Sequence, residues 1–299
     1  QHLSREEAKE VLGQISEGKY SPTQVSSFLT VFRMRSIHSE ELIGFRDCMR
    51  ERCVQIDLTE FDPIDLCGTG GDGKDTFNIS TLASFVVAGA GCKVAKHGNY
   101  GVSSSCGSSN LMEFLGYQFT DNPDTLREQI DKSGICFLHA PLFHPAMKNV
   151  APIRREMGVH TFFNMLGPMV NPSFPKRQMV GVFSLELLRY YKHIMEQEDL
   201  SYRIVHSMDG YDELSLTSDA MVVSPTGDKI FRANEIAKEP ISAEALHGGK
   251  TIAESADIFM SILNGNGTRE QNTVVAANAA MAMQCIYPEK DLDQLMDMA

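Results

Sequence analysis

The sequence predicts an α/β protein with a mostly parallel central sheet flanked by helices, preceded by a smaller, all-helical N-terminal domain. The first sixty residues carry only helical patterns, whereas from about residue 64 short apolar runs alternate with helical stretches. That alternation is typical of a parallel sheet whose ligand site lies at the carboxyl ends of its strands. We therefore expect a helical domain over residues 1–62 and an α/β domain over residues 63–299.

Three amphipathic helices are expected in the first domain. The first follows Ser4, which forms a capping-box pattern with Glu7. The second has Ser21 as its N-cap and Pro22 at its first position, and the third starts at Ser39 with two glutamates in its first turn. Their apolar faces need a partner, so this domain should pack against another part of the protein.

The α/β region shows short apolar runs that end in glycine, histidine or acidic residues. We interpret these runs as buried strands within residues 63–71, 92–98, 134–140, 178–184 and 202–210. Helices are expected between them, for example over residues 80–91. A further helix, from about Thr268 to Cys285, is rich in alanine and asparagine, which indicates close helix packing.

Composition excludes several classes of protein. The chain has 299 residues and an excess of 39 acidic over 27 basic side chains, a formal charge of -12, which argues against a broad nucleic-acid or anionic-membrane surface. We find no apolar run long enough for a membrane helix, no leader pattern and no CxxC among seven cysteines. The expectation is a cytoplasmic protein with reduced thiols. Because the chain starts at Gln1 and stops inside a helical pattern at Ala299, we expect a few residues to be missing at both ends.

The glycine loop GTGGDG, residues 68–73, matches two familiar phosphate-binding patterns only in part. It satisfies G-x-G-x-x-G, but the next strand ends in Lys96 and His97 where a dinucleotide site needs an acidic residue. It also approaches the nucleotide P-loop, but Asp75 stands where a Ser or Thr should ligate magnesium. Both interpretations are therefore disfavoured.

The remaining interpretation is a loop whose backbone amides bind anionic oxygens while Asp72 orients or accepts hydrogen bonds. The helix that follows begins near Asn78, Ser80 and Thr81, where free amides and the helix dipole favour a phosphate. Ser80 could also reach a magnesium ion. A simple N-cap would explain one of these residues but not the whole row.

Three further segments carry candidate site residues. The loop over residues 96–110 mixes one lysine, one histidine and many small donors, which suit phosphate or ribose oxygens. Asp212 and Glu213 could face a divalent cation, although an Asp-Gly turn with a solvated acidic cluster that includes Asp209 is the alternative. Arg154 and Arg155 could recognise a carboxylate, or form an ordinary surface charge pair on a helix.

Taken together, these motifs resemble the anthranilate phosphoribosyltransferases of tryptophan biosynthesis. The resemblance rests on four stretches in one order, DLCGTGGDGKDTFNIST, KHGNYGVSSSCGSSNLMEFLG, VAPIRREMGVHTFFNMLGPMVNP and GYDELS, and covers essentially the whole chain. It implies a two-domain fold with the active site at the hinge, near residues 145–172, and a homodimer through the N-terminal helices. It also implies transfer of phosphoribose from phosphoribosyl pyrophosphate to the amine of anthranilate, with Mg²⁺, two ions per subunit, and no nucleic-acid or membrane partner.

The resemblance also implies roles for individual residues. Phosphoribosyl pyrophosphate would contact Gly68, Gly71, Asp72, Thr76, Asn78, Ile79, Ser80, Thr81, Lys96, His97, Gly98, Asn99, Tyr100, Gly101, Val102, Ser103, Ser104 and Ser108. Anthranilate would contact Gly68, Asn99 and Arg154, and the metals would bind Ser80, Asp212 and Glu213. His97 could accept a proton or only position a ligand, so no catalytic residue is assigned, and Asp75 has no assigned role.

Four positions depart from the commonest pattern of this family. Tyr100 stands where arginine is usual, Ser105 where lysine is usual, Asn110 where aspartate is usual and His160 where arginine is frequent. The second loop thus loses two expected cations.

The alternative functions are a pyrimidine nucleoside phosphorylase or another phosphoribosyltransferase of the same fold, and a non-catalytic, nucleic-acid-binding family member. Intact GTGGD and NIST favour a pyrophosphorylated sugar over the phosphorylase, and the acidic charge with both carboxylates disfavours the non-catalytic member.

Overall fold

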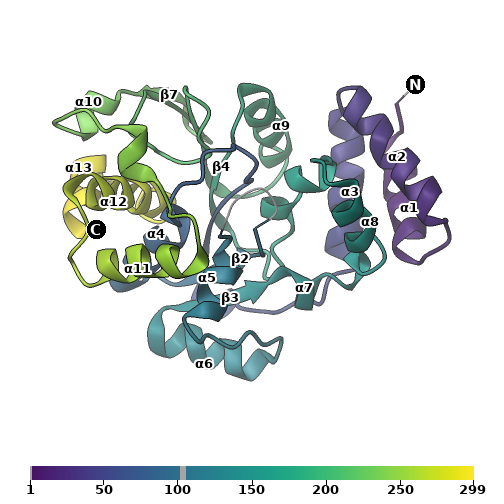
Figure 1. Ribbon diagram of the computed structural model, residues 1–299, viewed down its shortest axis with the longest axis horizontal. Coiled ribbons are helices and arrows are strands. Elements are labelled where there is room, and N and C mark those ends of the chain that lie inside the picture. The colour runs from purple at the N-terminus through teal and green to yellow at the C-terminus, as the bar shows by residue number, and fades with distance from the viewer. Residues whose placement is uncertain (1, 102–105) are drawn as a thin grey trace.

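The N-terminal helices form a bundle at one end of the molecule. A computed structural model describes residues 2–101 and 106–299, and Figure 1 shows the bundle in purple. It contains α1 (Arg5–Ser16), α2 (Pro22–Met34) and α3 (Ser39–Glu51). Ser4 forms the predicted capping box with Glu7, and Pro22 is the first residue of α2. Ser21 is the predicted N-cap of α2, and it also forms a capping box with Gln24, which was not predicted.

The central sheet has seven strands in the order β3-β2-β1-β4-β5-β6-β7. Five are parallel and coincide with the predicted apolar runs: β1 (Ile64–Gly68), β2 (Val94–Gly98), β3 (Ile135–His139), β4 (Arg177–Gly181) and β5 (Ser201–Ser207). The antiparallel hairpin of β6 (Ala220–Ser224) and β7 (Gly227–Phe231) was not predicted. The predicted fold class is confirmed, with a mixed edge added to the parallel sheet.

Helices cover both faces of the sheet, with the C-terminal helices on one side and α9 with the bundle on the other (Figure 1). Helix α12 packs along α4, and its alanines at positions 279, 280 and 282 are fully buried, as the composition predicted. The longer helices of this region are α4 (Ile79–Gly89), α6 (Pro123–Ser133), α9 (Leu185–Met195), α11 (Ile252–Leu263) and α12 (Arg269–Met283). Shorter ones are α5 (Ser108–Phe114), α7 (Ala140–Phe143), α8 (Ala151–Met157), α10 (Ala233–Ile236) and α13 (Leu292–Met298).

The strand order reverses between β1 and β4. The chain leaves β1 for β2 and β3 on one side and returns to β1's other side as β4. Such a reversal opens a crevice at the carboxyl ends of the strands, which is the usual ligand position in open α/β sheets. Gly68 and Gly181 are paired at these two strand ends and mark the crevice.

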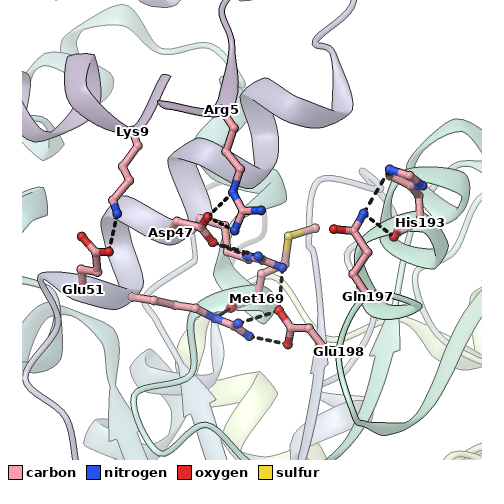
Figure 2. Close-up of polar contacts among 10 residues, drawn as sticks. Arg5, Lys9, Asp47, Glu51, Met169, His193, Gln197 and Glu198 are labelled. Carbon is pink, nitrogen blue, oxygen red and sulfur yellow. Dashed lines mark hydrogen bonds and ion pairs between the residues drawn. The ribbon is translucent and has the colours of Figure 1, made fainter. Parts of the chain in front are cut away.

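The bundle is joined to the α/β region by an apolar core and by ion pairs. Phe45 of α3 stacks on Phe162 with ring centroids 4.1 Å apart. Glu198, which follows α9, accepts hydrogen bonds from Arg46 and from Arg50 of α3, each at 2.6 Å (Figure 2). Arg50 also donates to the carbonyl of Met169 in η4 (Gly167–Val170), a short 3₁₀ helix that contacts both α3 and β2.

None of the helices in the described part of the chain combines the length and apolar character that crossing a membrane requires.

Candidate active site

All four sequence motifs meet in one cleft of about 290 Å³ at the carboxyl ends of β1 and β2. Its lining includes nearly all of the predicted ligand-binding residues that the structure describes: Gly68, Gly71, Asp72, Thr76, Asn78, Ser80, Thr81, Lys96, His97, Gly98, Asn99, Tyr100, Gly101, Ser108, Arg154, Asp212 and Glu213. Ile79 is the exception, because its side chain is buried in the core beside Phe77 and Leu82. Val102, Ser103 and Ser104, and also Ser105, lie outside the described residues.

Two buried carboxylates occupy the acidic side of the cleft. Asp212 accepts a hydrogen bond from the Gly70 N–H at 2.7 Å, and Glu213 accepts one from the Ser80 N–H at 3.0 Å, in the first turn of α4. Both side chains are almost fully buried. Each carboxylate is therefore held by a backbone amide of the glycine loop or of the helix that follows it.

Close backbone contacts place these carboxylates at the crevice between β1 and β4. A β-carbon on Gly68 would lie 2.3 Å from Oδ2 of Asp212, and one on Gly181 would lie 1.4 Å from the Asp212 carbonyl oxygen. Neither distance is sterically possible for a side chain. Glycine at both strand ends is thus what lets the Asp212 segment enter the crevice.

Two residues that the sequence reasoning missed hold the carboxylate segment. Asn278 of α12 donates to the Leu214 carbonyl at 2.9 Å and accepts from the Leu214 N–H at 3.0 Å. Ser207, at the end of β5, donates to the Glu213 carbonyl at 2.6 Å. The sequence did contain one indication of the role of Asn278, an asparagine within an alanine-rich helix that was expected to be closely packed. A buried amide group needs hydrogen-bond partners, so such a residue is a candidate for contacts with another segment.

Burial raises the pKa values of the acids in the cleft, and for Asp212 and Glu213 nearby negative charge raises them further. Burial, followed by repulsion from Asp72, raises the pKa of Asp212 to about 7. Burial and the neighbouring Asp212 raise the pKa of Glu213 well above its ordinary value, and burial raises the pKa of Asp72. A cation placed among them would relieve this repulsion.

The donor set suits a magnesium ion held jointly with a ligand. Within residues 2–101 and 106–299, no group of three or more His, Cys, Asp or Glu side chains forms a complete metal site. Magnesium is usually held by one or two carboxylates together with waters and substrate phosphate oxygens. Asp212 and Glu213, beside a loop of backbone amides, fit that arrangement. Asp209 lies apart on the surface, where Thr217 and Ser218 donate to it.

The glycine loop is also anchored to a segment that the sequence reasoning did not single out. The carbonyl of Asp75 accepts a hydrogen bond from the Gly248 N–H at 2.9 Å, and Phe77 donates to the Leu246 carbonyl at 2.9 Å. Asp75 has a φ of 48°, in the left-handed region that aspartate tolerates better than most residues. Its backbone therefore has a structural role in turning the loop toward α4.

The second loop brings Lys96 and His97 to the base of the cleft. His97 Nδ1 lies 3.2 Å from the Gly167 carbonyl oxygen, which can only accept, so Nδ1 carries the proton and Nε2 is the free acceptor. Nε2 is buried and has no hydrogen-bond partner among the residues that the structure describes. Burial, then the nearby His144, lowers the pKa of His97 to about 3, so the ring is neutral near pH 7.

Three of the four unusual positions, Asn110, Tyr100 and His160, have structural neighbours in this region. Asn110 accepts hydrogen bonds from the N–H groups of Gly101 at 2.8 Å and Gly107 at 3.1 Å, so an amide oxygen suffices to close this loop. The Tyr100 ring stands edge-on to His139, with ring centroids 4.8 Å apart. His160 reaches the glycine loop, since a β-carbon on Gly71 would lie 2.7 Å from its ring.

Arg154 supplies a half-buried cation to the same cleft as the two carboxylates. Its guanidinium donates to Asn164 at 3.2 Å and lies 5.0 Å from the Phe163 ring centroid. No ion pair of the described residues includes Arg154, and its Nε is buried without a hydrogen-bond partner. Burial lowers its pKa to about 10, which still leaves it charged near pH 7. An arginine in this state is suited to bind an anionic ligand.

Comparisons with known proteins agree with this architecture. Residues 1–53 match the helical bundle domain of a glycosyl transferase family, and residues 60–299 match the a/b domain of that family. The anthranilate phosphoribosyltransferase of Flavobacterium johnsoniae is 58% identical over 284 residues, covering 95% of this chain and 86% of that protein. The two comparisons thus cover the bundle, the sheet and the cleft.

Solved structures resemble the whole chain. The anthranilate phosphoribosyltransferase of Thermus thermophilus superposes with a TM-score of 0.90 at 34% identity, covering 100% of this chain and 90% of that one. The enzyme from Saccharomyces cerevisiae, in complex with PRPP and Mg, gives a TM-score of 0.88 at 26% identity, covering 99% and 88%. Another structure of the yeast protein contains 4-fluoroanthranilate.

The fold and the cleft define a glycosyl transferase built from a helical bundle and an a/b domain. The chain belongs to that family and, within it, to the anthranilate phosphoribosyltransferases.

Proposed function

We propose that this protein transfers the phosphoribosyl group of phosphoribosyl pyrophosphate to the amine of anthranilate, giving N-(5-phosphoribosyl)anthranilate and pyrophosphate. The observation that carries the proposal is that one cleft contains both a cation without an acidic partner in the described structure and two acids that repel each other. Arg154 is a half-buried cation without an acidic partner in the described structure, while Asp212 and Glu213 are crowded acids that need a cation. The carboxylate of an aromatic substrate would pair with Arg154. Magnesium bound to pyrophosphate would relieve the repulsion between Asp212 and Glu213.

The phosphoribosyl pyrophosphate would lie along the glycine loop, the start of α4 and the second loop. Backbone amides at a helix N-terminus favour phosphate oxygens. Ser80, Asp212 and Glu213 would hold Mg²⁺, which we propose to be two ions per subunit. When bound, Mg²⁺ neutralises the negative charge that develops on the departing pyrophosphate. The relative that binds PRPP and Mg supports this part of the proposal.

Anthranilate would lie between Arg154 and the second loop. Arg154 would pair its carboxylate, with Asn99 and Gly68 completing the pocket, and all three line the same cleft. The Phe163 ring beside the guanidinium offers an apolar surface for the aromatic ring. Fixing the carboxylate orients the amine toward the ribose, which lowers the entropic part of the barrier.

The chain's own residues would act by positioning and electrostatics. The aromatic amine of anthranilate is uncharged near pH 7, so attack needs no strong base. With a pKa of about 3, His97 would hold a proton poorly, which favours a positioning role over that of a proton acceptor. Preorganised amides and charges facing the leaving group would supply much of the acceleration.

The domain and subunit arrangement is also part of the proposal. We infer a helical domain over residues 1–62, an α/β domain over residues 63–299, a hinge near residues 145–172 and a homodimer through the helical domain. Exposed apolar side chains on α2, namely Val31 and Met34, support an interface there. Sedimentation of the protein as a monomer at micromolar concentration would contradict the dimer.

A fluorescence assay tests the proposed reaction. Anthranilate, phosphoribosyl pyrophosphate and magnesium are mixed with the protein, and the loss of anthranilate fluorescence is followed. Turnover that requires all three components supports the proposal. No turnover beside an active control enzyme would overturn it, and phosphorolysis of a pyrimidine nucleoside in its place would identify the related phosphorylase.

A further inference from the structure

Strands β1 and β2 pair less regularly than β1 and β4. Strand β1 is in register with β4 over its whole length, from Ile64 opposite Arg177 to Gly68 opposite Gly181. With β2 it has a single register pair, Ile64 opposite Val94. Beyond that pair the regular pairing of the two strands is interrupted, and the Asn171 side chain donates a hydrogen bond to the Ala95 carbonyl of β2 at 2.9 Å.

Two charged side chains add hydrogen bonds between β1 and β2. Asp65 of β1 accepts a hydrogen bond from the backbone N–H of His97 at 3.1 Å. Lys96 of β2 donates from Nζ to the Leu66 carbonyl of β1 at 2.6 Å. Each strand thus offers one charged side chain to the other strand's backbone.

Both charged groups are removed from water, with exposed fractions of 0% for Asp65 and 2% for Lys96. They form no direct ion pair, yet their opposite charges attract and oppose the cost of burying each. Gln178 and Cys67 donate to the other oxygen of Asp65, at 3.5 Å and 3.7 Å, which fixes the carboxylate. Lys96 has three donor hydrogens, one of which is directed to Leu66, and it lines the cleft.

We propose that Asp65 is a positioning residue that acts through Lys96. Its carboxylate holds the end of β2 through the His97 N–H, and its negative charge stabilises the Lys96 ammonium at the cleft. In that position Lys96 can bind the anionic oxygens of phosphoribosyl pyrophosphate. Asp65 does not line the cleft, so it touches no substrate. The inference rests on the proposed function, because it assigns Lys96 to that substrate.

A double-mutant cycle tests this coupling. Asp65→Asn keeps an oxygen for the His97 N–H but removes the negative charge. Lys96→Met removes the ammonium, and Lys96→Gln removes the charge but keeps a donor for the Leu66 carbonyl. Two alternative substitutions are used so that the cycle can be measured even if one of the variants does not fold. Calorimetry with phosphoribosyl pyrophosphate and magnesium measures substrate affinity without turnover, and steady-state kinetics gives KM and kcat.

We expect Asp65→Asn to weaken phosphoribosyl pyrophosphate binding about tenfold when Lys96 is present and less than about twofold when Lys96 is replaced. The KM for anthranilate should stay within about twofold. Equal losses in both backgrounds would show that Asp65 acts only on general stability and would overturn the inference. Ser201→Ala removes a hydroxyl bonded to Cys285 at the opposite end of the sheet and should leave the affinity unchanged.

The unmodified protein shows whether the proposed reaction or only the coupling between Asp65 and Lys96 is wrong. An unmodified protein that neither binds phosphoribosyl pyrophosphate nor consumes anthranilate overturns the reaction and this inference with it. An active unmodified protein with an additive cycle overturns the coupling alone.

Discussion

The carbonyl oxygen of Asp212 lies directly over Gly181, where a β-carbon would come within 1.4 Å of it. This contact joins the carboxylate segment to the end of β4, the strand beside the reversal in strand order. Because both partners are backbone, neither can rotate away. The position of Asp212 in the cleft therefore depends on glycine at residue 181.

Replacing Gly181 by alanine should displace the carboxylate segment. We expect a loss of about 3 kcal/mol or more in the free energy of unfolding, since overpacking against backbone cannot relax by a side-chain rotation. Magnesium-dependent activity should fall with it. Urea unfolding and the fluorescence assay measure both. Gly89→Ala is the matched control, because this helical glycine has nothing within 4 Å of its added β-carbon and should gain up to about 1 kcal/mol. Equal behaviour of the two variants would contradict the steric argument.

Replacing Arg154 by alanine should act mainly on anthranilate binding. Removing one partner of a desolvated charge pair costs roughly 3 kcal/mol, which corresponds to an increase of about 100-fold in KM for anthranilate. The KM for phosphoribosyl pyrophosphate should change far less. Arg155→Ala is the control, since Arg155 is the next residue of α8 and is exposed. An unchanged KM for anthranilate in Arg154→Ala would remove this residue from the substrate pocket.

The raised pKa of Asp212 predicts a dependence of stability on pH and magnesium. Its pKa is about 7 in the folded protein against an ordinary value of 3.8, so the folded state retains a proton that the unfolded state has released. Without magnesium, the free energy of unfolding should therefore fall between about pH 4 and pH 7, on the order of 2 kcal/mol. Excess magnesium should restore stability at pH 8 more than at pH 5.

Thermal unfolding at several pH values checks this dependence. Asp212→Asn should flatten the fall between pH 4 and pH 7 and reduce the effect of magnesium, because it removes the titrating group. Asp209→Asn changes an exposed acid three residues away and should retain the wild-type profile. A profile unchanged in Asp212→Asn would assign the titration to another group.

Glu198 should be needed to hold the bundle against the α/β region. Glu198→Ala leaves the buried Arg46 and also Arg50 without this shared acceptor, and we expect a loss of roughly 2–3 kcal/mol in the free energy of unfolding. Gln197→Ala is the control, since within the described structure the Gln197 side chain bonds only to His193 (Figure 2). It should change stability by less than about 0.5 kcal/mol. Similar losses in both variants would contradict a specific role for the ion pairs.

Local signals predicted the regular elements well. Continuous apolar runs predicted all five parallel strands, because strands buried on both faces need apolar residues on both sides. Caps at Ser4, Ser21 and Thr268 set the starts of three helices through hydrogen bonds between neighbours in the chain. The β6–β7 hairpin was missed, since β7 is an edge strand with mostly exposed residues, and its signal is limited to a short turn at Pro225 and Thr226.

The sequence by itself determined the elements, the loops that carry chemistry and the family resemblance, because each depends on residues close together in the chain. Tertiary structure decided which groups meet. Asn278 reaches the carboxylate segment from α12, and Asp65 and Lys96 form hydrogen bonds between β1 and β2. It also decided the charge states, since burial and crowding, not residue type, raise the pKa of Asp212 and lower that of His97. Those effects depend on distances and solvent exclusion that only the folded chain defines.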